Sequence, residues 1–414
     1  MSNGLVLTFF PRIGNIIMDK PKAYSKKAML ELKEEYTSKT TSLEITDNEP
    51  IKPNIIAIQN EAWWDSSLIP NATFSKDPMS HTREIMAEGK GGVLVSPVFA
   101  GGTCMPEFEF LTGFTTRYLP VAVYPYIQSI TSPTPSLASV CLKNGYETVA
   151  YHPYRKNFYG RNKAYPLIGF EKFIGMDELE EPQYRGWYIS DMQLTNDIIK
   201  LYEEKKQERI FVFGISMQNH GDYAKQRYDT YDIEVNSDVI SENDLQGLRD
   251  FTQGVYDTDV AFKKLVDYFR NVSEPTIIVM YGDHLPLLGT EGSTYQDGGF
   301  VEKKASFNYS EFEQLYKTPY VVWANYDISS YEFPEEISAG NLGVKIAQMA
   351  KLESIPWYYT FLDEFYTKYP VYENSAIKNQ NMETIDDILK EDKPLQKKFE
   401  LIEFDIINGK QYSK

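Results

Sequence analysis

Short, almost uninterrupted apolar segments recur along the chain and are separated by longer polar ones. Six of them have the length and bulk of a strand: Asn54–Gln59, Gly92–Val98, Thr148–Tyr151, Ile210–Ile215, Thr276–Met280 and Tyr320–Trp323. A strand that is apolar along its whole length, instead of at every second position, is typical of a sheet covered on both faces.

Between several of these segments, the apolar residues are spaced as on one face of a helix. The clearest case is Asn243–Asn271, where Leu245, Leu248, Val255 and Phe262 follow helical spacing. Strands that alternate with helices predict an α/β fold with a central, mostly parallel β-sheet flanked by helices. We expect this α/β domain to cover residues 51–355.

The two ends of the chain differ from this pattern. Residues 1–50 are polar and lysine-rich from residue 20, with a helix expected in Ser25–Tyr36, and are interpreted as a lead-in. Residues 356–414 are expected to form a small C-terminal α+β subdomain. Its predicted elements are helices at Trp357–Tyr369 and Glu383–Glu391, a strand at Phe399–Ile407 and, after an Asn-Gly turn, a last strand at 410–412.

Composition narrows the class of protein. In 414 residues, 42% are hydrophobic and 24% charged, which is typical of a folded chain and excludes disorder as its main state. The 42 basic and 59 acidic residues give a net charge of −17. Such a charge disfavours nucleic acid as a partner, because polyanions are bound through basic faces. An anionic substrate would need local cations or a metal ion.

Cysteines and apolar runs say less about where the protein works. Two cysteines, Cys104 and Cys141, cannot form a disulfide scaffold. The sequence has no run of 18 apolar residues, which is the length needed to cross a bilayer. The apolar segment Gly4–Phe10 is followed by Arg12 and has no signal-peptide pattern. It fits either an amphipathic helix or the stub of a membrane-anchored ectodomain, and both interpretations stay open.

Three of the four histidines stand at or just past the end of a predicted strand. They are His152, His220 and His284, whereas His81 lies in polar sequence and is expected at the surface. Each one alone would more often be a hydrogen-bonded structural residue. Three of them at equivalent strand ends indicate a binding site, because ligands of open α/β sheets bind at the carboxyl ends of the strands.

Carboxylates occur at the same positions. Glu61 follows the first strand, and Asp283 directly precedes His284. Glu61 alone is equally explained as an acid at a helix N-terminus. Together, oxygen ligands and one imidazole are a credible divalent-metal set.

Thr103 lies in Gly-Gly-Thr-Cys-Met-Pro-Glu-Phe, where a strand ends, two glycines allow a tight turn and a helix begins. By itself, it is best explained as a helix N-cap. Beside a metal site, the same hydroxyl becomes a candidate nucleophile, because coordination lowers its pKa. The neighbouring Cys104-Met-Pro does not complete a sulfatase signature, since Phe108 stands where that signature has arginine.

The segment from His152 to Arg161 combines a histidine, three cations and three aromatic residues in ten positions. It is either a basic surface loop or an anion-binding loop, in which Arg161 would hold phosphate oxygens through two parallel hydrogen bonds.

With these motifs, the chain resembles the lipoteichoic acid synthase family of phosphoglycerol transferases, within the alkaline phosphatase/sulfatase superfamily. The resemblance implies that Glu61, Asp283 and His284 bind a metal together with Thr103, which matches the catalytic threonine of a Gly-x-Thr-x-x-x-Glu-Phe pattern. A His-x6-Trp-x-Arg substrate-binding pattern falls on His152, Tyr159 and Arg161, with tyrosine in place of tryptophan, and His220 matches a histidine beside the leaving or attacking group.

The resemblance further implies an extracellular catalytic domain of a bacterial membrane protein, attached through an N-terminal anchor. Glycerol phosphate would pass from a phosphatidylglycerol-type lipid to Thr103 and then to a cell-surface glycan or teichoic acid acceptor. Manganese is the first choice for the divalent metal, with magnesium or zinc as alternatives. The rival functions are a phosphoethanolamine transferase or phosphodiesterase on the same scaffold, and a catalytically silent lipid- or glycan-binding sensor.

Overall fold

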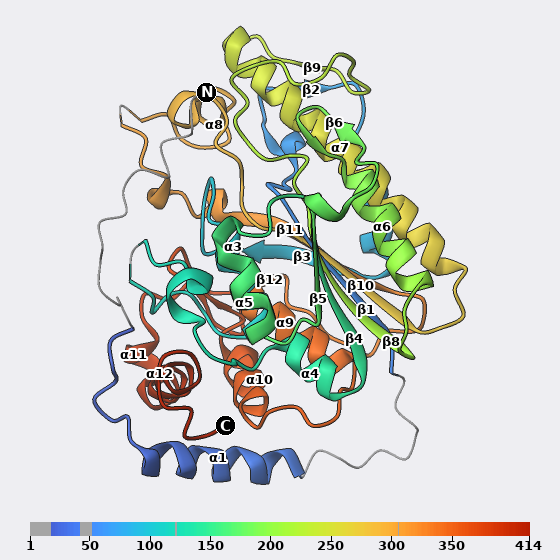
Figure 1. Ribbon diagram of the computed structural model, residues 1–414. Coiled ribbons are helices and arrows are strands. Elements are labelled where there is room, and N and C mark those ends of the chain that lie inside the picture. Colours follow the sequence, from blue (N-terminus) through green and yellow to red (C-terminus); the bar gives the residue numbers. More distant parts are fainter. Residues whose placement is uncertain (1–17, 42–51, 121, 305) are drawn as a thin grey trace.

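The computed structural model describes residues 18–41, 52–120, 122–304 and 306–414, so the apolar segment Gly4–Phe10 lies outside the described residues. At its centre is a sheet of eight strands (Figure 1). Their order is β12 (Glu336–Ser338), β3 (Lys90–Val95), β11 (Lys317–Ala324), β10 (Thr276–Gly282), β1 (Asn54–Asn60), β8 (Arg209–Ile215), β4 (Tyr146–His152) and β5 (Lys172–Gly175). Only β11 runs antiparallel to its neighbours in this sheet. The predicted α/β fold with a mostly parallel sheet is confirmed.

All six strands predicted from apolar runs are present in the sheet, with ends that move by a few residues. The two strands that the sequence did not reveal, β5 and β12, are four and three residues long and form its two edges. Each begins with a charged residue, Lys172 or Glu336, so neither carries the apolar run that marks a buried strand.

Helices cover both faces of the sheet, and β1 shows how the sequence permits this. Ile55 and Ala57 belong to one buried cluster and Ile56 and Ile58 to the other, because successive side chains of a strand point to opposite faces. One face packs against α2 (Ser80–Glu88), α6 (Asp191–Glu203) and α7 (Glu242–Arg270), and the other against α3 (Cys104–Thr112), α4 (Leu137–Lys143) and α9 (Ala339–Met349) (Figure 1). The helix predicted at Asn243–Asn271 is α7.

The C-terminal residues lie beside the α3 face and next to the first helix, α1 (Lys26–Thr41) (Figure 1). They form α10 (Tyr358–Lys368), a hairpin of β13 (Val371–Tyr372) and β14 (Ile377–Lys378), α11 (Ile388–Glu391) and α12 (Lys393–Ile407). The predicted strand at Phe399–Ile407 is wrong, because these residues belong to α12. Residues 410–412 form no strand either.

Phe399–Ile407 is helical because the residues that start the helix, a cap and a first-turn proline, precede the alternating segment. Asp392 accepts a hydrogen bond from the Leu395 backbone N–H, and Pro394 occupies the first turn, where proline is tolerated. Leu395, Phe399, Ile402 and Ile406 then recur at helical spacing, and all are buried.

The remaining short elements lie in connections: β2 (Thr73–Phe74) with β9 (Val235–Asn236), β6 (Tyr184–Arg185) with β7 (Tyr188–Ile189), α5 (Arg161–Leu167) and α8 (Ser293–Asp297). Within the described residues, no helix combines the length and the apolar character needed to cross a membrane.

Candidate active site

The carboxyl ends of four neighbouring parallel strands position most of the predicted site residues. Glu61 follows β1, Asp283 and His284 follow β10, His152 is the last residue of β4, and His220 comes five residues after β8. Thr103 directly precedes α3, after the Gly101-Gly102 turn. Both glycines have positive φ angles, of 142° and 90°, a backbone conformation that side chains rarely adopt.

Glu61, Asp283 and His284 form a buried cluster whose ligand atoms all lie within 4.8 Å of one another. His284 Nε2 is 3.6 Å from Glu61 Oε1 and 3.3 Å from Asp283 Oδ2. Thr103 Oγ1 donates to Glu61 Oε2 at 3.3 Å. The four residues predicted as metal ligands are therefore brought together.

The hydrogen bonds around this cluster leave ligand atoms free. Asp283 Oδ1 accepts from the backbone N–H groups of Ala62 and His284, but its Oδ2 and His284 Nε2 have no hydrogen-bond partner although both are buried. The His284 Nδ1–H donates to the Leu285 carbonyl at 3.0 Å, because a carbonyl can only accept, so Nε2 is the ring nitrogen that could bind a metal ion. Unpaired carboxylate oxygen and imidazole nitrogen facing each other fit a divalent cation.

The electrostatics of the cluster point to the same kind of occupant. Burial and the nearby Asp283 carboxylate raise the pKa of Glu61 to about 8, against the smaller opposing effect of His284. Two carboxylates held this close in a dry site repel each other, and a cation between them would remove that repulsion.

Thr103 does not act as a helix cap, which was the alternative explanation for it. Its backbone is already helical, with φ −39° and ψ −35°, and its side chain makes no capping hydrogen bond. The hydroxyl is instead directed at Glu61. Gln59 holds the Thr103 carbonyl at 2.9 Å and is itself held by the Tyr281 hydroxyl, so the sheet fixes the position of this turn.

Arg161 is fully buried and paired with Glu107, a residue to which sequence reasoning assigned no role. Arg161 Nη2 and Nε donate to Glu107 Oε2 at 2.7 and 3.0 Å, and the Tyr165 hydroxyl donates to Glu107 Oε1. Glu107 occupies the Nε–Nη2 side of the guanidinium, so the predicted pair of hydrogen bonds to a phosphate would come from its other end, from Nη1 and the second Nη2 hydrogen. Its buried Nη1 has no partner and remains available for an anion.

Glu107 could have been found from its spacing. It follows Thr103 by four residues, so the two side chains stand on the same face of the helix start. Tyr159 lies with its ring 5.3 Å from the Arg161 guanidinium, in the position where the resembling family has tryptophan. The pair and the stacked ring fix Arg161 relative to the threonine.

His152 and His220 resemble His284 in how the main chain orients them. The His152 Nδ1–H donates to the Ile215 carbonyl and the His220 Nδ1–H to the Gly221 carbonyl, at 3.2 and 2.7 Å. Burial lowers the pKa of both rings, and most strongly that of His152, where the Arg161 charge adds to the effect. Both rings are therefore neutral near pH 7, with Nε2 free to accept a proton or hydrogen bond.

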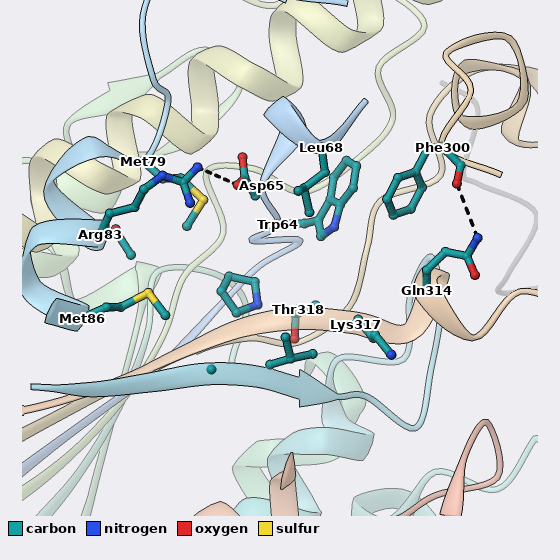
Figure 2. A pocket seen from close by; sticks show the side chains of 14 residues that line it. Trp64, Asp65, Leu68, Met79, Arg83, Met86, Phe300, Gln314, Lys317 and Thr318 are labelled. Atoms are coloured by element: carbon teal, nitrogen blue, oxygen red, sulfur yellow. Dashed lines mark hydrogen bonds and ion pairs between the residues drawn. The ribbon is translucent and has the colours of Figure 1, made fainter. Parts of the chain in front are cut away.

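Two cavities flank this edge of the sheet. One, of about 280 Å³, lies between α2 and the β3–β11 strands and is lined mainly by apolar side chains such as Trp64, Met79 and Met86, with the Asp65–Arg83 ion pair at one side (Figure 2). The other, of about 430 Å³, lies against the β6–β7 hairpin and is more polar. Neither is lined by Glu61, Asp283 or His284.

The arrangement defines a class: an α/β fold in which a threonine hydroxyl at a helix start stands beside a buried cluster of two carboxylates and an imidazole, and near an arginine. The description "Sulfatase" names the family model that matches residues 53–352, which is most of the chain. The chain belongs to the sulfatase family. Burial raises the pKa of the neighbouring Cys104 thiol well above its usual value, and it is the Thr103 hydroxyl that contacts the cluster.

Known proteins of similar sequence and fold agree with this assignment. A curated protein of Rhizobium meliloti, named for the modification of cyclic beta-1,2-glucan, is 34% identical over 366 residues, covering 87% of this chain and 56% of that protein. The chain thus spans little more than half the length of this relative.

Two solved structures share the fold across nearly their whole length. The Streptococcus pyogenes phosphoglycerol transferase GacH, in complex with sn-glycerol-1-phosphate, has a TM-score of 0.77 at 21% identity and covers 96% of this chain and 97% of its own. The lipoteichoic acid synthase LtaP from Listeria monocytogenes has a TM-score of 0.61 at 17% identity, with 91% and 95% covered. The predicted resemblance and the predicted class, a sulfatase-like enzyme, are confirmed.

Proposed function

We propose that this chain is a metal-dependent phosphoglycerol transferase that moves glycerol phosphate from a phosphatidylglycerol-type lipid through Thr103 to a cell-surface glycan. The observation that carries the proposal is the position of the Thr103 hydroxyl, 3.3 Å from Glu61 in the buried cluster with Asp283 and His284. The family, the fold shared with GacH and the name of the Rhizobium relative support it.

In the first displacement, Thr103 Oγ forms a bond to phosphorus while the bond from phosphorus to the diacylglycerol oxygen breaks. Glu61, Asp283, His284 and Thr103 are the residues that would hold the divalent ion. Such an ion, when bound, lowers the pKa of the hydroxyl and polarises a phosphoryl oxygen. Arg161 Nη1 binds a second phosphoryl oxygen, and Glu107 keeps the guanidinium in place for this contact.

In the second displacement, an acceptor hydroxyl forms the new bond to phosphorus and the bond to Thr103 Oγ breaks. The proton of the acceptor passes to His220 Nε2, which is neutral and unpaired on that side. Sequence reasoning also gave His220 the task of protonating the departing lipid alkoxide. The lowered pKa fits both tasks. The neutral ring takes the proton of the Thr103 hydroxyl in the first displacement and that of the acceptor in the second, and the imidazolium gives it up readily, first to the diacylglycerol oxygen and then to Thr103 Oγ.

His152 offers Nε2 as an acceptor, because its Nδ1–H is already donated to Ile215. We assign it to a donor group of the substrate, such as a glycerol hydroxyl, instead of a phosphate oxygen. Manganese is the ion that we propose first for a set of oxygens with one nitrogen, before magnesium and zinc. The site of action that we propose is the extracellular face of a bacterial membrane, where lipid donor and glycan acceptor meet.

The test is to replace Thr103 by Ala and by Ser and to follow diacylglycerol release and glycerol phosphate transfer from labelled phosphatidylglycerol with manganese present. Thr103→Ala removes the attacking oxygen, so turnover falls by many orders of magnitude. Since the side chain caps no helix, the melting temperature stays nearly unchanged. Thr103→Ser keeps part of the activity, because a primary hydroxyl can still attack.

The same assay separates the rival functions. Near-normal turnover of Thr103→Ala would refute the proposed nucleophile. Release of ethanolamine from phosphatidylethanolamine, with phosphatidylglycerol left intact, would indicate a phosphoethanolamine transferase. A protein that binds manganese but releases neither product would be a sensor. Thr112→Ala, a change in a threonine at the other end of α3 whose hydroxyl donates to the Phe108 carbonyl and accepts from the Phe114 N–H, is the matched control.

A further inference from the structure

The β6–β7 hairpin, Tyr184–Ile189, stands beside the proposed base and has no role in the mechanism above. Tyr188 on β7 places its hydroxyl 3.4 Å from His220 Nδ1, and its ring lies edge-on to the imidazole. Arg227 donates to the His220 carbonyl at 2.7 Å and is stacked on Trp187, in the hairpin turn, at 5.1 Å. The hairpin is thus attached to the His220 loop from two sides.

The polar cavity of about 430 Å³ opens on the same hairpin. Gln218 lines it and precedes His220 by two residues, and Ser190 lines it and follows Tyr188 by two residues. Two residues of extended chain span at most about 7 Å, so the backbone of the cavity wall at Gln218 lies within about that distance of the backbone at His220. Its volume lies in the range of small-ligand sites, about 300–1,000 Å³.

The walls of the cavity carry charged side chains that pair with one another, and two exposed aromatic rings lie beside it. Arg185 donates to Asp257 at 2.9 Å and to Asp232 at 3.3 Å, so one guanidinium faces two carboxylates. The rim is the part of the hairpin beside the cavity: Tyr184, which lines the cavity, is 56% exposed, and Trp187, in the adjoining turn, is 41% exposed. These two exposed rings are three residues apart. Tyrosine and tryptophan are common in binding interfaces, because each combines an apolar ring face with a polar hydrogen-bonding group.

We propose that this cavity and its rim, Tyr184, Arg185, Trp187, Gln218, Asp232 and Asp257, bind a neutral sugar unit of the acceptor glycan. The inference rests on the proposed function and deepens it by naming the place and the chemical class of the acceptor. Sugar C–H faces stack on Tyr184 and Trp187, while hydroxyl groups bond to the carboxylates, the amide and the guanidinium. A neighbouring sugar unit then presents its hydroxyl to His220.

Charge favours a neutral glycan over a teichoic acid chain, which carries a phosphate on each unit. The cavity itself has two carboxylates against one guanidinium, and the whole chain has a net charge of −17. Both would repel a polyanion. A neutral polyol suffers no such repulsion and can satisfy the polar groups of the walls.

The experiment is a calorimetric titration of the Thr103→Ala protein, in which no turnover interferes, with neutral cyclic beta-1,2-glucan. Trp187→Ala and Tyr184→Ala, each added to Thr103→Ala, are expected to weaken binding about tenfold, as for the loss of one stacked ring. Asp232→Ala is a second kind of variant, since its side chain is largely exposed and its loss costs the fold little. It should also weaken binding.

Tyr412→Ala is the matched control, because Tyr412 is a similarly exposed aromatic residue near the C-terminus, at the other end of the molecule from the hairpin (Figure 1). Trp187→Phe should retain most of the binding, because a phenyl ring can still stack on a sugar face. A glycerol phosphate polymer, titrated in parallel, should bind more weakly than the glucan.

Glucan binding that is equal in all of these variants would overturn the inference and leave the proposed function intact, since the Thr103 assay tests that separately. Tighter binding of the glycerol phosphate polymer would overturn it as well. If Trp187→Ala instead lowers binding to phosphatidylglycerol vesicles and leaves glucan binding unchanged, the rim contacts the membrane and the inference is wrong.

Discussion

The buried pair of Glu107 and Arg161 gives the sharpest stability test of the site. Both side chains are fully excluded from solvent. Removing one partner of such a pair leaves an uncompensated buried charge and costs about 3–5 kcal/mol, whereas replacing both by apolar residues of similar volume is often nearly neutral. We therefore expect Glu107→Met and Arg161→Met each to destabilise the protein by that amount, and the double variant to recover most of the loss.

The comparison is a double-mutant cycle of four proteins: the parent, Glu107→Met, Arg161→Met and the double variant. Because the Tyr165 hydroxyl also donates to Glu107 and would be left without a partner, all four proteins carry Tyr165→Phe. The assay is chemical denaturation, read as the midpoint at constant m-value. The two single variants should also differ in their dependence on pH. An orphaned buried carboxyl can be neutralised by a proton, whereas a guanidinium keeps its charge, so only the cost of Arg161→Met should shrink below neutral pH.

The same variants are also assayed for glycerol phosphate transfer. The double variant should fold but fail to transfer glycerol phosphate, since Arg161 Nη1 is gone. A double variant as unstable as the worse single one would refute the reasoning that the two charges compensate each other. Full activity in Glu107→Met would refute the positioning role of Glu107.

Three further predictions concern other parts of the chain. Burial and the neighbouring Glu109 raise the pKa of Glu403, and burial raises that of Glu109 to about 7. A raised carboxyl pKa contributes stability below the unfolded pKa, near 4.3, that is lost as pH rises through the folded pKa, which is about 7 for Glu109. Glu109→Gln should therefore raise the denaturation midpoint at pH 8 more than at pH 5, and equal shifts would contradict this. Manganese at 100 times its dissociation constant should stabilise the protein by about 2.7 kcal/mol in a thermal melt. Asp283→Ala should remove this effect, and an unchanged shift would place the metal elsewhere. Gly282→Ala should lower both the melting temperature and the manganese effect, because its Cβ would lie 2.1 Å from the Trp63 carbonyl oxygen; a wild-type melt would show that this strand end can relax.

The fold was predictable because the strands of a sheet covered on both faces are apolar along their whole length. Ile55 to Ile58 shows this pattern, and so do the central strands β8 and β10. The edge strands β5 and β12 have no such pattern, because an edge needs little apolar surface. The segment Phe399–Ile407 misled for a related reason: nearly every residue in it is buried, so its apolar spacing fits a strand as well as a helix.

The site was predictable as far as residue types at strand ends reveal chemistry. Glu61, Asp283 and His284 meet because the carboxyl ends of β1 and β10 are neighbours. What the sequence could not show was which groups are already engaged. Only contacts in space reveal that Glu107 occupies one side of Arg161, that Thr103 makes no capping bond, and that Gln59 holds the turn.

The three histidines of the site are all oriented by the main chain. This feature affects which substitutions around the site leave the rings in place. Each ring is aimed by a peptide carbonyl, from Ile215, Gly221 or Leu285. A peptide carbonyl is supplied by any amino acid, so the side chains at those three positions can change without turning the rings. Substitutions in the surrounding pocket therefore need not change the orientation of the histidine rings. Under the proposed function, residues of the rim can be altered for a new acceptor while the rings of His152, His220 and His284 keep their direction.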